Sequence, residues 1–199
     1  MDSRTLISNR VLIHLGISGN IQDYKEESRE ATIIRNNYDI ARDYVLKDFD
    51  WGFASCYKEL SLASKTEENS ITGYLYEYHY PDNCISARSL YQKGDKVEKE
   101  FKTASNENGL PIILTNISPA VLRYTRRVEN EVLFPAEFEM ALSLYLAYLC
   151  AETLTGSSQK ADRMLQKYDY TKRRSQKLNA DEGRADDENN STYLDERFF

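Results

Sequence analysis

The side chains best suited to acid–base or metal chemistry are few and lie far apart in this sequence. The chain of 199 residues has two histidines. His14 falls at the end of a predicted helix, where a histidine usually bonds the last free carbonyls. His79 falls in a tyrosine-rich predicted strand, where a surface or packing role is expected. Neither histidine has a second ligand at metal-binding spacing, so the sequence predicts no metal site and no cofactor.

Cysteine chemistry has one candidate. Cys84 and His79 flank a single predicted turn, and a thiol beside an imidazole is the arrangement of a cysteine nucleophile, although no third orienting group is evident. The three cysteines, Cys56, Cys84 and Cys150, are odd in number and lack C-x-x-C spacing. This usage is typical of reduced, buried thiols inside a cell. The sequence has no Gly-rich phosphate loop, G-x-S-x-G elbow or H-E-x-x-H motif. We therefore expect no enzyme activity.

The acidic charge is concentrated near the C-terminus. The net charge is −6, and residues 181–199, with seven acids and two arginines, contribute −5 of it. No basic field of the kind that binds nucleic acid tightly and non-specifically is present. The beginning, MDSRTLISNR, lacks the apolar core of a signal peptide, and the uncharged part of the most apolar stretch is too short to span a bilayer. We expect no membrane partner.

The sequence predicts two kinds of element, helices and strands, that position the histidines and cysteines. Residues 2–15 and 24–49 have apolar residues every three or four positions, which predicts helices. From Cys56 the pattern changes to alternation, clearest where four tyrosines alternate with other residues between Tyr74 and Tyr80. Strands are predicted at 74–80, 84–92, 97–103, 110–115 and 120–128, within a region of four to six antiparallel strands. Pro111 should push its strand toward a sheet edge.

The most apolar stretch, residues 135–155, predicts a central helix that begins after Pro135 and ends at Gly156. Apolar residues cover almost every direction around it, so other elements must bury it. If a neighbouring subunit covers part of this helix, an apolar strip of Leu144, Tyr148 and Ala151 would be exposed in the monomer. Full burial within one chain would instead make the helix part of the hydrophobic core and not an interface.

The next helix, from residue 158, is amphipathic, with a basic face between Lys160 and Lys177. Past residue 180 the composition is too polar for the segment to order by itself. We predict an α+β protein that is mostly α. Residues 1–55 and 133–180 form an antiparallel helical bundle, residues 56–132 an inserted antiparallel β region, and residues 181–199 an extended acidic docking tail. Aromatic and apolar anchors end that tail: Tyr193, Leu194, Phe198 and Phe199.

The most basic spot in the β region combines Arg123, Arg126 and Arg127. These arginines either pair with the nearby Glu129 and Glu131 or contact another subunit. The basic face of the 160–177 helix is either solvated or a surface for nucleic acid.

Short motifs, spread in order over about residues 5–180, carry a resemblance to a known family. An N-terminal helix ends in His14-Leu15-Gly16, and a long helix leads to Trp51-Gly52-Phe53-Ala54, similar to a "W-x-F-A" helix end. Tyr78 to Cys84 is similar to a "Y-x-Y-P-x-D-C" strand turn, with the acid displaced by one position. The series continues with Leu114-Thr115-Asn116, Leu122 to Val128, Phe134 to Phe138, and Leu146 to Ala151, the last similar to "L-A-x-x-L-A". The chain resembles the head-to-tail adaptor proteins of short-tailed bacteriophages, also called gatekeeper or tail tubular protein A.

The resemblance implies a structural virion protein at the head–tail junction, made in the cytoplasm of the host bacterium. Twelve copies would form a ring that binds the portal protein, joins it to the tail nozzle or a second ring protein, and lets genomic DNA pass without specific binding. The C-terminal segment would reach between portal subunits. The alternatives are a nucleic-acid-binding module that uses the 160–177 face and a cell-wall hydrolase, a role proposed for some relatives, for which no suitable acid pair is evident here.

Overall fold

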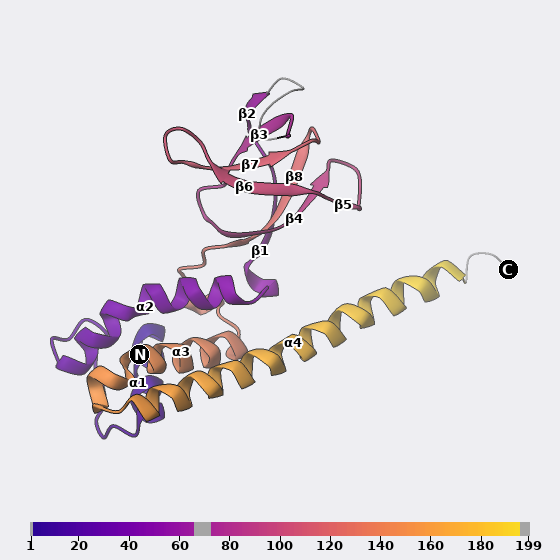
Figure 1. Ribbon diagram of the computed structural model, residues 1–199. Helices are drawn as coiled ribbons and strands as arrows, with labels where there is room; N and C mark the ends of the chain where they lie inside the picture. The colour runs from indigo at the N-terminus through magenta and orange to yellow at the C-terminus, as the bar shows by residue number, and fades with distance from the viewer. Residues whose placement is uncertain (1, 66–72, 196–199) are drawn as a thin grey trace. The chain divides into compact units, whose positions relative to one another are not determined.

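The chain folds into two compact units, and the second is inserted into the first. The computed structural model describes residues 2–65 and 73–195. Unit 1 contains residues 1–45 and 130–199, and unit 2 contains residues 46–129. The described residues form four α-helices and two antiparallel sheets of four strands each (Figure 1). The prediction of a mostly α helical bundle is therefore wrong: the protein is a mixed α/β fold.

Helix α1 spans Ser3–Leu15 and α2 spans Arg29–Asp48. Gly16 ends α1 in the left-handed conformation with φ 67°, which glycine adopts without steric cost. Helix α2 begins later than predicted because the Ser28 side chain accepts a hydrogen bond from the Ala31 N–H at 3.3 Å. Ser28 thus satisfies one of the free N–H groups at the helix start.

Helix α3, Ala136–Thr155, is the core of unit 1. It follows Pro135 and ends at Gly156, as predicted, with Gly156 at φ 66° and its N–H bonded to the Glu152 carbonyl. Ten of its residues are buried, including Leu144 and Ala151, and Tyr148 is half-buried. The apolar strip expected of a ring interface is therefore absent, and α3 is plain core.

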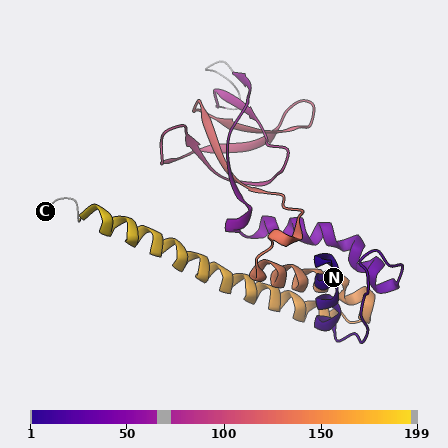
Figure 2. The ribbon, with the colours of Figure 1, turned by 180° about the vertical axis from the view of Figure 1, so that it is seen from behind.

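Helix α4 spans Ser158–Asp195 and runs back along α3, with Met164 and Tyr168 buried. Its 38 residues measure about 57 Å, against about 30 Å for the 20 residues of α3. Figure 2 shows that α4 continues well past the end of α3. The predicted extended tail is thus helical as far as Asp195. After Ser158 the sequence has no proline, and adding a residue to an existing helix avoids the cost of nucleation.

Unit 2 is built of two four-stranded sheets. Sheet A has the order β1-β8-β4-β5 and sheet B the order β2-β3-β7-β6. The chain passes almost directly from β1 to β2 and from β5 to β6, so it switches sheets at each step. The strands are β1 Ser55–Glu59, β2 Leu62–Lys65, β3 Tyr76–His79, β4 Cys84–Gln92, β5 Glu98–Lys99, β6 Phe101–Ser105, β7 Pro111–Thr115 and β8 Ala120–Arg126.

Side chains from both sheets meet in one core. Tyr78 and Ile113 come from sheet B, and Leu90, Leu122 and Tyr124 come from sheet A. The described strands number eight, more than the four to six predicted, because β1 and β2 are largely exposed and β5 has two residues. Such strands lack the alternation of apolar and polar residues that predicts a strand.

The prediction that Pro111 places its strand at an edge is also wrong. Strand β7 lies inside sheet B, between β3 and β6. Pro111 is the first residue of β7 and faces Ser105 at the end of the β6–β7 hairpin. A missing N–H is tolerated at the first residue of a strand.

Candidate functional site: interaction surfaces

The histidine at the end of α1 has a different partner from the one expected. The His14 Nε2 lies 3.1 Å from the Ser143 hydroxyl of α3, so His14 fastens α1 to α3 instead of bonding its own helix carbonyls. Burial lowers the pKa of His14, and the nearby cations Lys167 and Arg10 lower it further. Burial and these two positive charges therefore favour the neutral imidazole.

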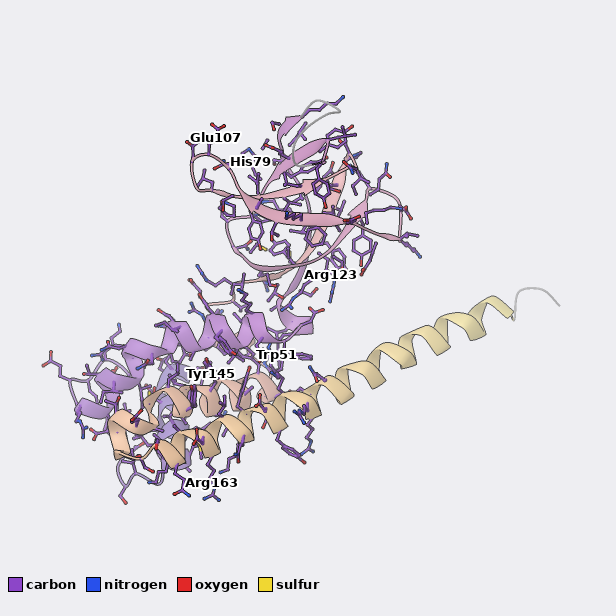
Figure 3. The ribbon with its side chains drawn as sticks, in the orientation of Figure 1. Trp51, His79, Glu107, Arg123, Tyr145 and Arg163 are labelled. Atoms are coloured by element: carbon purple, nitrogen blue, oxygen red, sulfur yellow. The ribbon has the colours of Figure 1, made fainter. Side chains whose placement is uncertain are left out.

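The structure gives no support to a nucleophilic Cys84. Its thiol lies beside the Tyr80 hydroxyl, and burial raises its pKa, whereas a nucleophile needs a lowered pKa. His79 is exposed on sheet B (Figure 3). All three cysteines are free thiols, and burial raises the pKa of Cys150 to about 12. The cysteines are unpaired, as predicted, but only Cys150 is buried, whereas Cys56 and Cys84 are partly exposed.

The three arginines of the β region do not form one cluster. Arg123 and Arg126 are three residues apart on β8, so their side chains point to opposite faces of sheet A. The Arg123 Nη2 donates to the Asp50 carboxylate at 2.7 Å, not to Glu129 or Glu131. Glu131 is paired with Arg4 of α1. Arg127 follows β8, and its backbone N–H bonds the Asn83 carbonyl at 2.7 Å.

Arg88 of β4 is a structural residue that the sequence pattern did not single out. Its Nη2 donates to the carbonyls of Lys47 at 2.9 Å and Phe49 at 3.0 Å, where α2 ends. Its Nε donates to the Thr125 hydroxyl at 2.8 Å. The last carbonyls of a helix have no partner within it. One guanidinium therefore fixes the end of α2 to sheet A.

A hollow of about 370 Å³ lies on the face of sheet A that points away from the unit 2 core. The rings of Tyr57 and Tyr91 line it, with centroids 6.3 Å apart. Around this hollow, Lys93 pairs with Glu59 at 2.8 Å. The surface offers aromatic contact area but little net charge.

The most distinctive surface is a groove of about 420 Å³ in unit 1, formed by the end of α1, by α3 and by α4. We call it the α3–α4 groove. Its floor is Leu144, which is buried, and Met140, which is 41% exposed. Arg163 and Lys167 of α4 form a basic wall. The groove is lined by His14, Met140, Leu144, Arg163, Gln166, Lys167, Tyr170 and Thr171.

The basic face of α4 is smaller than the sequence suggests, because some of its cations are engaged. Lys160 donates to the Leu15 carbonyl at 2.9 Å, and Lys172 pairs with Asp169 at 3.7 Å. Arg163 and Lys167 are exposed, and Figure 3 shows Arg163 on the outer side of α4. Of the predicted docking residues, Tyr193 and Leu194 fall in the last turn of α4, with side chains outside the described part, and Phe198 and Phe199 lie outside the described residues.

Among the side chains that the structure describes, those of residues 2–65 and 73–176, no group of acidic, histidine and cysteine residues is arranged to hold a metal ion. None of the described helices combines the length and apolarity needed to cross a bilayer. No protein-family model matches the chain, and a search of curated proteins finds no relative.

Proposed function

We propose that this protein is a structural virion component, an adaptor whose copies form a ring between the portal vertex and the tail of a short-tailed bacteriophage. The observation that carries the proposal is the ordered series of motifs that resembles this family of adaptors. Three of these motifs lie where one element gives way to the next. The Trp51 motif follows α2, the Pro81 turn precedes β4, and Pro135 precedes α3. Motifs at such junctions determine how elements connect.

The proposal gives α4 the role of reaching the portal. About 18 residues of α4 extend beyond the length of α3, or about 27 Å of helix. The apolar residues Tyr193 and Leu194 fall at the far end of this extension. A helix end with aromatic and apolar anchors is suited to insertion into a groove on a partner.

Arg123, Arg126 and Arg127 are the proposed contacts of the β unit with a neighbouring copy or a tail protein. Because Arg123 is paired with Asp50, its contribution would be a preformed ion pair. The chain's net charge of −6 favours a channel through which DNA slides without sticking.

Electron microscopy of the protein mixed with its cognate portal protein tests the proposal. A ring of copies seated on the portal is the expected result, and image symmetry counts the copies. A double variant, Tyr193→Asp with Leu194→Asp, should keep the circular dichroism spectrum but lose the ring. A matched double change on exposed α1 residues, Leu6→Asp with Ile13→Asp, controls for added charge. If the unaltered protein forms no complex with the portal, the proposal fails.

A nucleic-acid module is the alternative, and the exposed Arg163 and Lys167 are the observation that favours it. It predicts binding to duplex DNA with an affinity that falls steeply as salt increases. The adaptor proposal predicts no such binding at physiological salt. Fluorescence anisotropy with a labelled duplex distinguishes the two.

A further inference from the structure

The α3–α4 groove has the chemistry of a site for an acidic ligand. Arg163 and Lys167 stand on one wall, and no acidic side chain lines the groove. Within the described part of the chain, neither cation has an ion-pair partner. Glu139, which precedes the groove residue Met140 on α3, is already paired with Arg10 at 2.6 Å. The lowered pKa of His14 reflects burial first and then the charges of Lys167 and Arg10, which agrees with a positive potential in the groove.

The exposed apolar side chains of the groove favour a ligand that also carries apolar groups. Met140 is 41% exposed and Tyr170 is 69% exposed, whereas Leu144 beneath them is buried. Exposed apolar side chains beside unpaired cations suit a helix or peptide that carries both acids and aromatic residues. The groove volume of about 420 Å³ admits a few side chains, not a domain.

The chain itself contains a segment with this composition. Residues 181–199 hold seven acids and two arginines, followed by the anchors Tyr193, Leu194, Phe198 and Phe199. The segment cannot reach the groove of its own copy. Thr171 lines the groove, and the same helix carries residue 181 about 15 Å further away, as Figures 1 and 2 show for the course of α4. A second copy can supply it.

We propose that the α3–α4 groove binds the acidic C-terminal segment, residues 181–199, of a second copy of this chain. The groove and the segment are different surfaces, so the contact is head-to-tail and leads to a ring if the rotation closes, or to a filament if it does not. The inference does not depend on the proposed function. The segment also carries the proposed portal anchors, so in the free protein the groove holds it, and the portal competes for it.

Sedimentation velocity of the full chain over a range of concentrations measures this contact. The groove variant carries Arg163→Glu with Lys167→Glu. The control carries Arg173→Glu with Arg174→Glu, two exposed positions on the same helix outside the groove, and has the same change in net charge. Turning two attractive contacts into repulsive ones should weaken self-association about tenfold or more, and the control should change it about twofold or less. Circular dichroism confirms that both variants fold.

Raising the salt from about 50 mM to about 500 mM should also weaken the association, because it shortens the Debye length. A chain that stays monomeric at low salt overturns the proposal. Equal loss of association in both variants overturns it as well, since general charge would then explain the result.

Cross-linking identifies the residues in contact. Equal amounts of ¹⁴N- and ¹⁵N-labelled full chain are mixed and treated with a carbodiimide, which joins a lysine amine to a carboxylate with loss of water. The expected product is a mixed-isotope link between Lys167 and an acid of residues 181–188. Links from Lys167 only within one isotope, or only to acids elsewhere, overturn the proposal. Because neither experiment contains a portal, a failure here leaves the proposed function standing, and a failure to bind the portal leaves this contact standing.

Discussion

Replacing Arg88 with methionine should destabilise unit 2 by about 3 kcal/mol. The substitution removes three short hydrogen bonds, to the Thr125 hydroxyl and to the carbonyls of Lys47 and Phe49. A hydrogen bond from a charged donor contributes about 1.5–3 kcal/mol when it is shielded from water. The bond to Lys47 is exposed, so water can replace it. The two part-buried bonds, at about 1.5 kcal/mol each, give the estimate.

Differential scanning calorimetry measures the effect. In a unit of roughly 80 residues, each 1 kcal/mol shifts the Tm by about 4–8 °C. The Arg88→Met variant should therefore unfold about 12–24 °C lower if unit 2 unfolds by itself. If both units unfold in one transition, the shift should be about half as large. Arg88→Lys should recover only part of the loss, because one ammonium group cannot span the hydroxyl and the two carbonyls.

Lys93→Met is the matched control. Lys93 directly follows the strand that contains Arg88, β4, and is also paired, with Glu59 at 2.8 Å, but both side chains are at least half exposed. Exposed ion pairs contribute about 0–1 kcal/mol. A loss in Arg88→Met no larger than that of the control would refute the view that Arg88 caps the end of α2.

Three further predictions concern unit 1. Because the pKa of His14 is lowered, the unfolded chain takes up a proton at a higher pH than the folded chain. The contribution of His14 to stability is therefore complete above pH 6.5 and is lost as the pH falls. Between pH 7 and pH 5, urea titrations should show a smaller decrease in the free energy of unfolding for His14→Gln than for the unaltered protein. Burial raises the pKa of Cys150 to about 12, so a thiol-counting assay should find Cys150 unreactive until the protein is unfolded, and equal reaction of all three cysteines in native buffer would contradict this. Leu146 is fully buried in α3, so Leu146→Ala should cost about 3 kcal/mol in urea unfolding, whereas Ile13→Ala, at a side chain 74% exposed, should stay within about 0.5 kcal/mol.

The helices were the most predictable part of the fold, since their signals are local. Pro135 and Gly156 mark the two ends of α3, and the apolar residues between them require burial on all sides. The amphipathic pattern from residue 158 predicted for the same reason that α4 has one buried face, and Met164 and Tyr168 lie on it. The end of α4 was not predictable in this way, because residues 181–195 have neither a strong helix pattern nor a proline to stop one.

The β unit was predicted less completely because its strands depend on partners far away in the chain. Strand β2 is exposed throughout, so its sequence carries no alternation, and its place is set by pairing with β3. Arg88 illustrates the same difficulty for a single residue. Its partners lie about 40 residues away on either side, and no local pattern distinguishes it from a surface arginine.

The α3–α4 groove could not be predicted from the sequence for a similar reason, since His14, Met140 and Lys167 come from three helices. Each residue was visible in the sequence, but their proximity was not. The structure also shows that α4 supplies a groove wall with its first half and carries the acidic segment with its second. When one helix bears both halves of a head-to-tail contact, the distance between them is fixed by the helical rise of about 1.5 Å per residue. Each copy then adds the same rotation and translation. A fixed rotation allows such a contact to close into a ring with one defined number of copies.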